Sequence, residues 1–222
     1  MIFQLLQNPL ILVFFLVSII LAVAFHEFCH AWAATRLGDF TAKYQGRLTL
    51  NPLKHLDPIG FILMLVAGFG WGKPVPVNSN ALKKRSDEAL ISVAGPVSNV
   101  IFAFIVAIPL LILQNFSSLP ETNAILVFLS TLLEVNILLG VFNLIPLPPL
   151  DGFNIVRSLT PNAWQPSIEK FGKSGPAILI GIIALDYITG IDLLYPLIMG
   201  GERIVSGVIS QSIMFFIDLI KH

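Results

Sequence analysis

The sequence predicts an all-α polytopic membrane protein with about five to six transmembrane helices, and two observations support this expectation. Of the 222 residues, 55% are hydrophobic and only 12% are charged, whereas a soluble domain carries about 25% charged residues. Long apolar segments with few or no charges alternate with polar stretches that hold most of the Lys and Arg side chains. We therefore take the lipid bilayer as the environment of this chain.

The first expected transmembrane helix runs from about Pro9 to Thr35. Between Pro9 and Phe25 the only polar side chain is Ser18, and the sequence His26-Glu27-Phe28-Cys29-His30 follows directly. No Lys or Arg precedes this run and no small-residue cleavage pattern follows it, so we expect the segment to be retained rather than removed as a signal peptide. Ionisable side chains are costly in hydrocarbon, which makes the motif a candidate functional site.

The spacing within this motif is that of a metal site. His-Glu-x-x-His on a helix puts two imidazoles one turn apart on one face, with a carboxylate beside them, as in zinc hydrolases. Catalytic zinc takes three protein ligands and keeps one position open. The metzincin extension is excluded, because Ala33 and Arg36 stand where that class has Gly and His. The third ligand is therefore His55, His222 or a carboxylate.

The region after the first helix predicts a re-entrant element with short β-strands beside it. The apolar stretch at 59–69 is too short to cross a hydrocarbon core of about 30 Å comfortably as a helix. Residues 46–50 and 73–77 alternate polar and apolar side chains, as strands do, and two prolines limit the second to a sheet edge. Such an edge can accept an extended peptide, and the alternative is a plain interfacial loop.

Two further segments are expected to cross the membrane. Residues 89–113 contain no charge, and residues 122–150 contain only Glu134. The second of these leads into Asp151, which is the best candidate for a carboxylate ligand. Beyond residue 174 an apolar run and a last segment near 204–220 are interrupted by Gly, Pro and Asp, so the number of crossings there stays open.

The distribution of basic residues predicts the orientation, because Lys and Arg favour the cytoplasmic side. None of the 13 precedes Arg36, and eight lie between residues 36 and 85. With the N-terminus outside and 59–69 re-entrant, all but Arg203 face the cytoplasm. A crossing at 59–69 would move Lys73 and the cluster at 83–85 to the other side. We therefore expect the His-Glu-x-x-His motif toward the cytoplasmic end of the first helix, with Asp151 at a similar depth.

Four motifs, taken in order, resemble the site-2 protease family of intramembrane zinc metalloproteases. They are HEFCH at 26–30, NPLKHLDPIG at 51–60, GPVSN at 95–99 and NLIPLPPLDG at 143–152. The resemblance covers about residues 20–160 and is closest to the compact branch of the family, which has no PDZ or CBS domain. It implies a multi-pass protein, which we expect in the cell membrane of a prokaryote.

The resemblance also implies roles for individual residues. His26, His30 and Asp151 are expected to bind one zinc ion per chain, and Glu27 is expected to act as the general base. Substrate-facing or oxyanion-stabilising roles follow for Asn99 and Asn143.

Each of these candidates has a structural alternative. Asp151 could instead cap a helix, and Asn99 and Asn143 could simply bond neighbouring helices. Asn136 is expected on the same helical face as Asn143. This pattern indicates a face that packs or lines a cavity rather than a catalytic role. His55 is interpreted as a gate or accessory residue rather than a ligand. Cys29, the only cysteine, is assigned to packing.

The resulting functional expectation is a zinc metalloendopeptidase. It would cut within or near the transmembrane helix of a single-pass membrane protein, in regulated intramembrane proteolysis. We expect a single protease domain over 1–222, with a catalytic core at about 9–160 and C-terminal helices at 174–222. The formal net charge of zero argues against a nucleic-acid partner. The alternatives are a catalytically silent metal-binding scaffold or transporter, and a membrane zinc hydrolase acting on a lipid-linked or prenylated substrate.

Overall fold

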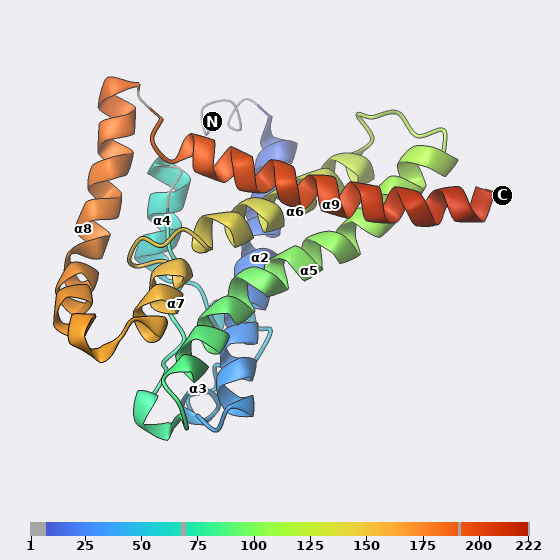
Figure 1. Cartoon of the computed structure of the whole chain (residues 1–222). Coiled ribbons are helices and arrows are strands. Elements are labelled where there is room, and N and C mark those ends of the chain that lie inside the picture. Colours follow the sequence, from blue (N-terminus) through green and yellow to red (C-terminus); the bar gives the residue numbers. More distant parts are fainter. Residues whose placement is uncertain (1–7, 68–69, 191, 222) are drawn as a thin grey trace.

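The computed structural model describes residues 8–67, 70–190 and 192–221, and its regular structure is helical (Figure 1). In chain order the helices are α2 (Pro9–Arg36), α3 (Thr41–Tyr44), α4 (Pro58–Ala67), α5 (Ser86–Phe116), α6 (Ala124–Asn143), α7 (Asp151–Leu159), α8 (Gln165–Thr189) and α9 (Tyr195–Lys221). Short 3-10 turns lie at Pro52–Lys54, Ser79–Ala81 and Asn162–Trp164. The mostly helical architecture predicted from composition is confirmed.

Three of the described helices, α2, α5 and α6, are long and apolar enough to cross a membrane. They contain 28, 31 and 20 residues, which at about 1.5 Å per residue matches or exceeds the hydrocarbon thickness. The structure thus identifies three candidate spans in its described part, where the sequence predicted five to six. Helices α8 and α9 have 25 and 27 residues, but polar and charged side chains such as Asp186 and Arg203 interrupt them.

The three candidate spans pack together, and α9 lies across two of them. Figure 1 shows α9 running over α5 and α6 at the end of the molecule where α2 begins. Its buried side chains Ile209, Ile213 and Ile217 repeat at every fourth residue, which places them on one helical face. They pack in a cluster with Ala103 and Ala107 of α5 and with Ile137 and Val141 of α6. Other faces of α2 and α5 carry rows of exposed aliphatic side chains.

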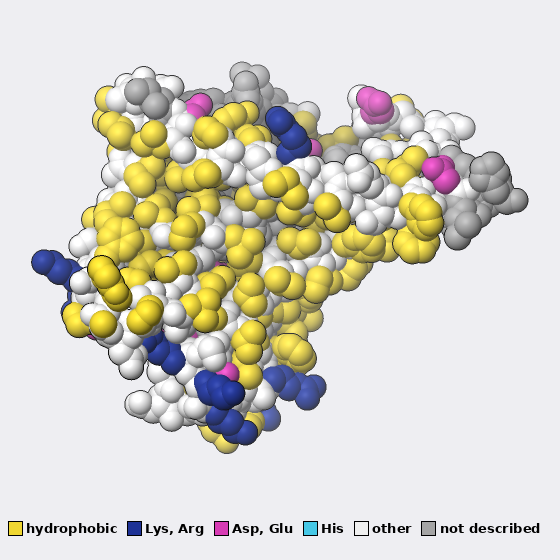
Figure 2. Space-filling model, viewed as in Figure 1, with side chains coloured by type: hydrophobic (Ala, Val, Ile, Leu, Met, Phe, Trp, Pro, Cys, Tyr) yellow, Lys and Arg dark blue, Asp and Glu magenta, His cyan; other side chains and the backbone are white. Residues whose placement is uncertain are grey.

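Those exposed rows fit a lipid environment. On α2 the side chains of Val13, Val17 and Leu21 point outward, and on α5 those of Ile101 and Ile105 do so. Contiguous apolar surface of this kind is rare on soluble monomers. Figure 2 shows hydrophobic side chains over the middle of one face, while most of its Lys and Arg side chains gather at the lower end, where α3 and the start of α5 lie. An apolar middle with basic side chains at one end is the surface expected of a protein that spans a bilayer.

The β-strands predicted at 46–50 and 73–77 are not confirmed. Among the described residues of this region, one isolated antiparallel bridge joins Leu56 and Gly72, and the Lys73 amide donates to the His55 carbonyl at 2.7 Å. The pairing cannot continue far, because Pro74 and Pro76 have no N–H groups to donate. Helix α4 has ten residues, about 15 Å, which is too short to span a bilayer. Residues 68–69 of the predicted re-entrant segment lie outside the described part.

A buried carboxylate holds the chain between α2 and α5. Asp39 is 0% exposed, and its two oxygens accept hydrogen bonds from the Thr41 amide at 2.9 Å and the Asn78 amide at 2.7 Å. Burial raises the pKa of Asp39, but the hydrogen bonds from Thr41 and Asn78 outweigh it, so the pKa lies below its ordinary value. The charged form therefore ties the segment after α2 to the segment before α5.

Replacing Asp39 by Asn should destabilise the protein. The amide keeps one acceptor oxygen, so one of the two N–H groups loses its partner, at a cost of about 0.5–1.5 kcal/mol in the free energy of unfolding. Asp57→Asn is the matched control, because Asp57 accepts one backbone hydrogen bond, from Gly60, which an Asn oxygen can also accept. Equal stability loss in both variants, measured by unfolding in detergent, would contradict this role.

The same variant should show a defined pH dependence. Because the folded-state pKa of Asp39 is lowered, its stabilising contribution is complete above the unfolded value of about 3.9. It is lost as the pH falls through the folded-state value. The difference in the free energy of unfolding between the wild type and Asp39→Asn should therefore be constant above the unfolded-state pKa of Asp39. It should become smaller only at lower pH.

Candidate metal centre

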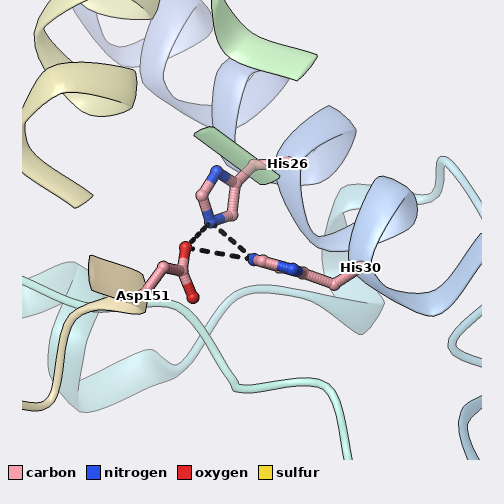
Figure 3. A group of neighbouring side chains, drawn as sticks. All are labelled: His26, His30 and Asp151. Atoms are coloured by element: carbon pink, nitrogen blue, oxygen red, sulfur yellow. Dashed lines mark hydrogen bonds and ion pairs between the residues drawn. The ribbon is translucent and has the colours of Figure 1, made fainter. Parts of the chain in front are cut away.

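Two histidines of α2 and one aspartate of α7 converge in the interior (Figure 3). The Nε2 atoms of His26 and His30 lie 3.0 Å apart. The Oδ2 atom of Asp151 lies 3.1 Å from the first and 3.2 Å from the second. His26 is 5% exposed and His30 is 7% exposed. Side chains from positions 26, 30 and 151 thus form one nearly equilateral triangle of candidate ligand atoms.

The hydrogen bonds behind the rings determine what those atoms offer. His26 Nδ1 donates to Asn99 Oδ1 at 2.7 Å, and His30 Nδ1 donates to the Ile91 carbonyl at 2.7 Å. With the ring protons on Nδ1, both Nε2 atoms present lone pairs to each other and to the Asp151 carboxylate. Three lone pairs facing one point repel one another unless a proton or a metal ion lies between them. The donor set and the orientation of its atoms therefore fit a metal ion.

The spacing also fits a particular coordination. Tetrahedral zinc with bonds of about 2.0–2.1 Å has ligand atoms about 3.3 Å apart. The observed separations of 3.0 to 3.2 Å are close to that value. His–His–carboxylate sets that leave the fourth position open are typical of catalytic zinc sites.

Helix α5 forms the wall behind the two histidines. Its residues Ile91, Gly95 and Asn99 recur every four positions and so lie on one face. A Cβ atom at Gly95 would lie 2.3 Å from His30 Nε2 and 2.6 Å from His26 Cε1. Only glycine leaves room for both rings at this position. Gly95 belongs to the GPVSN motif, but the sequence alone indicated no role for it.

Asp151 is brought to the site by the turn between α6 and α7. At Gly152 a Cβ atom would lie 2.3 Å from the Leu144 carbonyl oxygen, so this tight turn requires glycine. Asp151 is the first residue of α7, and the N-cap residue Leu150 makes no side-chain capping bond. The carboxylate faces the two histidines, which favours the ligand interpretation over the capping alternative.

Helix α7 is anchored to the beginning of α5. The Arg157 guanidinium pairs with Glu88 at 3.2 Å. The Arg85 guanidinium donates to the Arg157 carbonyl and to Asn162 Oδ1. The same helix, α5, therefore supports both histidines at its middle and the aspartate-bearing helix at its start.

An internal cavity of about 590 Å³ opens onto the triad. Glu27 and Asn143 line it together with the three converging side chains, and its remaining walls include apolar residues of α4, α8 and the segment 70–77. A Cβ atom at Gly72 would lie 3.5 Å from Glu27 Oε1, so this segment passes directly over the Glu27 carboxylate. Asn143 Nδ2 donates to the Leu139 carbonyl at 3.0 Å.

Among the described residues, the predicted positions Asn99, His55 and Cys29 are not part of the cavity lining. Asn99 is 0% exposed and its Oδ1 accepts a hydrogen bond from His26. Its position therefore favours support of that histidine over contact with a substrate. His55 is buried, and its Nε2 donates to the Thr49 carbonyl at 2.7 Å, away from the triad. His222 lies outside the described residues. Cys29 is partly buried on α2 and is not part of the described triad.

Sequence analysis missed Arg47. Its side chain is buried, and its guanidinium donates to the Lys73 carbonyl, which holds the segment over Glu27 in place. The only signal in the sequence was a single basic residue within an alternating stretch, and such a residue usually lies at the membrane surface.

The fold and this site together define a class, the helical membrane proteins with a buried metallohydrolase-type centre. A family model described as Peptidase family M50 matches residues 109–183. A Bacillus subtilis protein provisionally named the zinc metalloprotease YwhC is 42% identical over 89% of this chain and 91% of its own length. The chain therefore belongs to peptidase family M50, and the predicted membership of the site-2 protease family is confirmed.

More distant relatives have the same kind of name. A Methanocaldococcus jannaschii protein, provisionally named the zinc metalloprotease MJ0611, is 30% identical over 72% of this chain and 74% of its own length. A Mycolicibacterium smegmatis protein, provisionally named the zinc metalloprotease Rip2, is 32% identical over 62% of this chain and 54% of its own length. No solved structure matches the chain significantly.

Replacing Gly95 by Ala should abolish metal binding while leaving the bundle folded. The new methyl group would occupy the space of both imidazoles, and metal affinity should fall by more than about 100-fold, since even the loss of groups behind the ligands costs about 10- to 100-fold. The control is Gly207→Ala on α9, where a Cβ meets nothing within 4 Å. Metal content after dialysis measures the outcome, and a Gly95→Ala protein with full metal would refute the close approach.

Proposed function

We propose that this chain is a zinc-dependent intramembrane endopeptidase. The observation that carries the proposal is the buried group of His26, His30 and Asp151, which shares one cavity with Glu27. Membership of family M50 supports the same reaction class. We take the whole chain as one protease domain, with its catalytic core at about 9–160 and its C-terminal helices at 174–222.

The proposed mechanism assigns a task to each residue. One zinc ion held by the three side chains would supply the Lewis acidity that activates water near neutral pH and polarises a peptide carbonyl. Glu27 accepts the proton of the attacking water as the new C–O bond forms, and it then delivers that proton to the nitrogen as the C–N bond breaks. Asn143 lines the cavity, and we assign the Nδ2 hydrogen that it does not donate to the Leu139 carbonyl to the developing oxyanion.

The walls of the cavity suggest how a substrate binds. They are largely aliphatic and aromatic, from α4, α8 and the segment 70–77, which suits the apolar side chains of a transmembrane segment. A helical substrate hides its carbonyls in hydrogen bonds and must unwind before attack, which is expensive in lipid because freed backbone groups have few partners. The extended segment anchored by Arg47 and by the carbonyl of His55 would offer such partners. We assign His55 this accessory role.

The proposed orientation follows from charge. On the face shown in Figure 2, most basic side chains gather at the end where α3 and the start of α5 lie, and this end faces the cytoplasm under the positive-inside rule. The N-terminus would then be outside, and the zinc would lie toward the cytoplasm. The expected substrate is a single-pass membrane protein cut in the cytoplasmic half of its helix, in regulated intramembrane proteolysis. The bacterial and archaeal relatives favour a prokaryotic cell membrane.

Glu27→Gln should keep zinc and fold but lose peptide hydrolysis. The amide cannot accept a proton, and general-base catalysis contributes about 10²- to 10⁴-fold to the rate. The purified protein is reconstituted in liposomes with a single-pass substrate peptide, and cleavage and zinc content are both measured. Asp151→Ala serves as the second arm and should lose zinc as well as activity.

The alternatives give different results in this assay. A silent scaffold or transporter would hold zinc and cleave nothing, with or without Glu27. A hydrolase for lipid-linked or prenylated substrates would leave the peptide intact but turn over such a lipid. Normal cleavage by Glu27→Gln would refute the mechanism given above.

Cysteine labelling tests the topology. With Cys29 replaced, single cysteines near Lys43 and Lys84 should react with an impermeant reagent from the cytoplasmic side, because ten-residue α4 between them cannot span the bilayer. A cysteine near Ser118, between α5 and α6, should react from the outside. Reaction of the first two positions from opposite sides would show that the segment between them crosses.

A further inference from the structure

We propose that Asn136 is a positioning residue for the metal ligand His26 and acts on it through Asn99. This inference rests on the proposed zinc site and assigns a new role to two amide side chains behind it. The chain of contacts crosses three helices, from α6 through α5 to α2.

The orientation of Asn136 is determined by its own helix. Its Nδ2 donates to the Leu132 carbonyl one turn earlier, at 2.8 Å. Its Oδ1 is thereby turned outward, where it accepts a hydrogen bond from Asn99 Nδ2 at 3.1 Å. Asn136 is 0% exposed, so no water competes for either contact.

The orientation of Asn99 follows from that of Asn136. Its Nδ2 has two hydrogens, and it donates one to Asn136 and the other to the Ala22 carbonyl of α2, at 3.2 Å. Both donors are used, so Oδ1 must point the other way, where it lies 2.7 Å from His26 Nδ1. A flipped amide would set oxygen against oxygen at Asn136 and at Ala22.

This orientation selects the tautomer of His26. An acceptor at Nδ1 keeps the proton there and leaves the lone pair on Nε2, which is the atom in the triad. A flipped Asn99 would present an N–H group to Nδ1 instead. The proton would then move to Nε2, where it would compete directly with the metal.

The two histidines differ in this respect. His30 Nδ1 donates to the Ile91 carbonyl, a main-chain group that cannot flip. His26 is therefore the ligand whose tautomer depends on side chains, and it needs a second amide to hold the first. This explains why two fully buried amides lie between apolar helices, where an unpaired polar group is costly.

The competing explanation is that the amides only join helices. Interhelical hydrogen bonds between such residues are common in membrane bundles and stabilise them. In that case their removal would lower the stability of the metal-free protein without a specific effect on metal affinity. A double-mutant cycle on zinc affinity separates the two explanations, because only a relay makes the effect of Asn136 on zinc affinity depend on Asn99.

The experiment measures zinc affinity of the full chain in detergent by competition with a chromophoric chelator, alongside the stability of the metal-free protein. Asn99→Leu should weaken zinc binding about 10- to 100-fold, and Asn136→Leu about 10-fold or less. In the Asn99→Leu background, Asn136→Leu should cause no further loss. Additive losses, or unchanged zinc affinity with lower stability, would overturn the proposal.

Two further variants keep the test decisive. Asn99→Asp retains an oxygen acceptor for His26 and should bind zinc far better than Asn99→Leu, whereas equal weakening would overturn the proposal. The control is Ser98→Ala, which removes a buried hydrogen bond to the Gly95 carbonyl on the same helix and should leave zinc affinity unchanged. If the unmodified chain binds no zinc, it is the proposed function that fails rather than the relay.

Discussion

Two imidazole nitrogens and a carboxylate oxygen held within 3.0 to 3.2 Å of one another are the constraint on which this structure depends. Such a group is unfavourable unless a proton or a metal ion lies between its atoms, so the surrounding protein must hold it in place. One face of α5 does this, with the Ile91 carbonyl and the Asn99 amide as acceptors and Gly95 as the space between them. The metal proposed here would then relieve the repulsion that the fold maintains.

The two sides of the centre have opposite properties, and the proposed chemistry needs both. On the α5 side the histidines meet buried amides and a glycine, with no room for another atom. On the other side lies the cavity that contains Glu27 and Asn143. The proposed chemistry would use the closed side to hold the metal ligands and the open side to admit water and a peptide. The anchoring of α7 by Glu88 and Arg157 keeps the third ligand at the boundary between them.

Much of this could be predicted from the sequence, and the failures have clear causes. Uninterrupted apolar runs located α2, α5 and α6, since hydrocarbon tolerates few other segments. Alternation at 73–77 predicted a strand, but Pro74 and Pro76 remove the donors that a ladder needs. Similarity of motifs suggested a substrate contact for Asn99, whereas its side chain lies behind His26. A motif identifies a residue as important but does not state which way it points.

By itself, the sequence determined the family, the apolar helices and the pair of histidines one helical turn apart, because all three are local patterns along the chain. Only the tertiary structure showed that Asp151, already the best candidate in the sequence, meets both histidines, which groups their Nδ1 atoms contact and which residues line the cavity. The contacts that His26 and His30 make with other helices join residues 61 to 125 positions apart. They depend on how helices pack, and packing against Gly95 or Gly152 leaves no periodic signal in a single sequence.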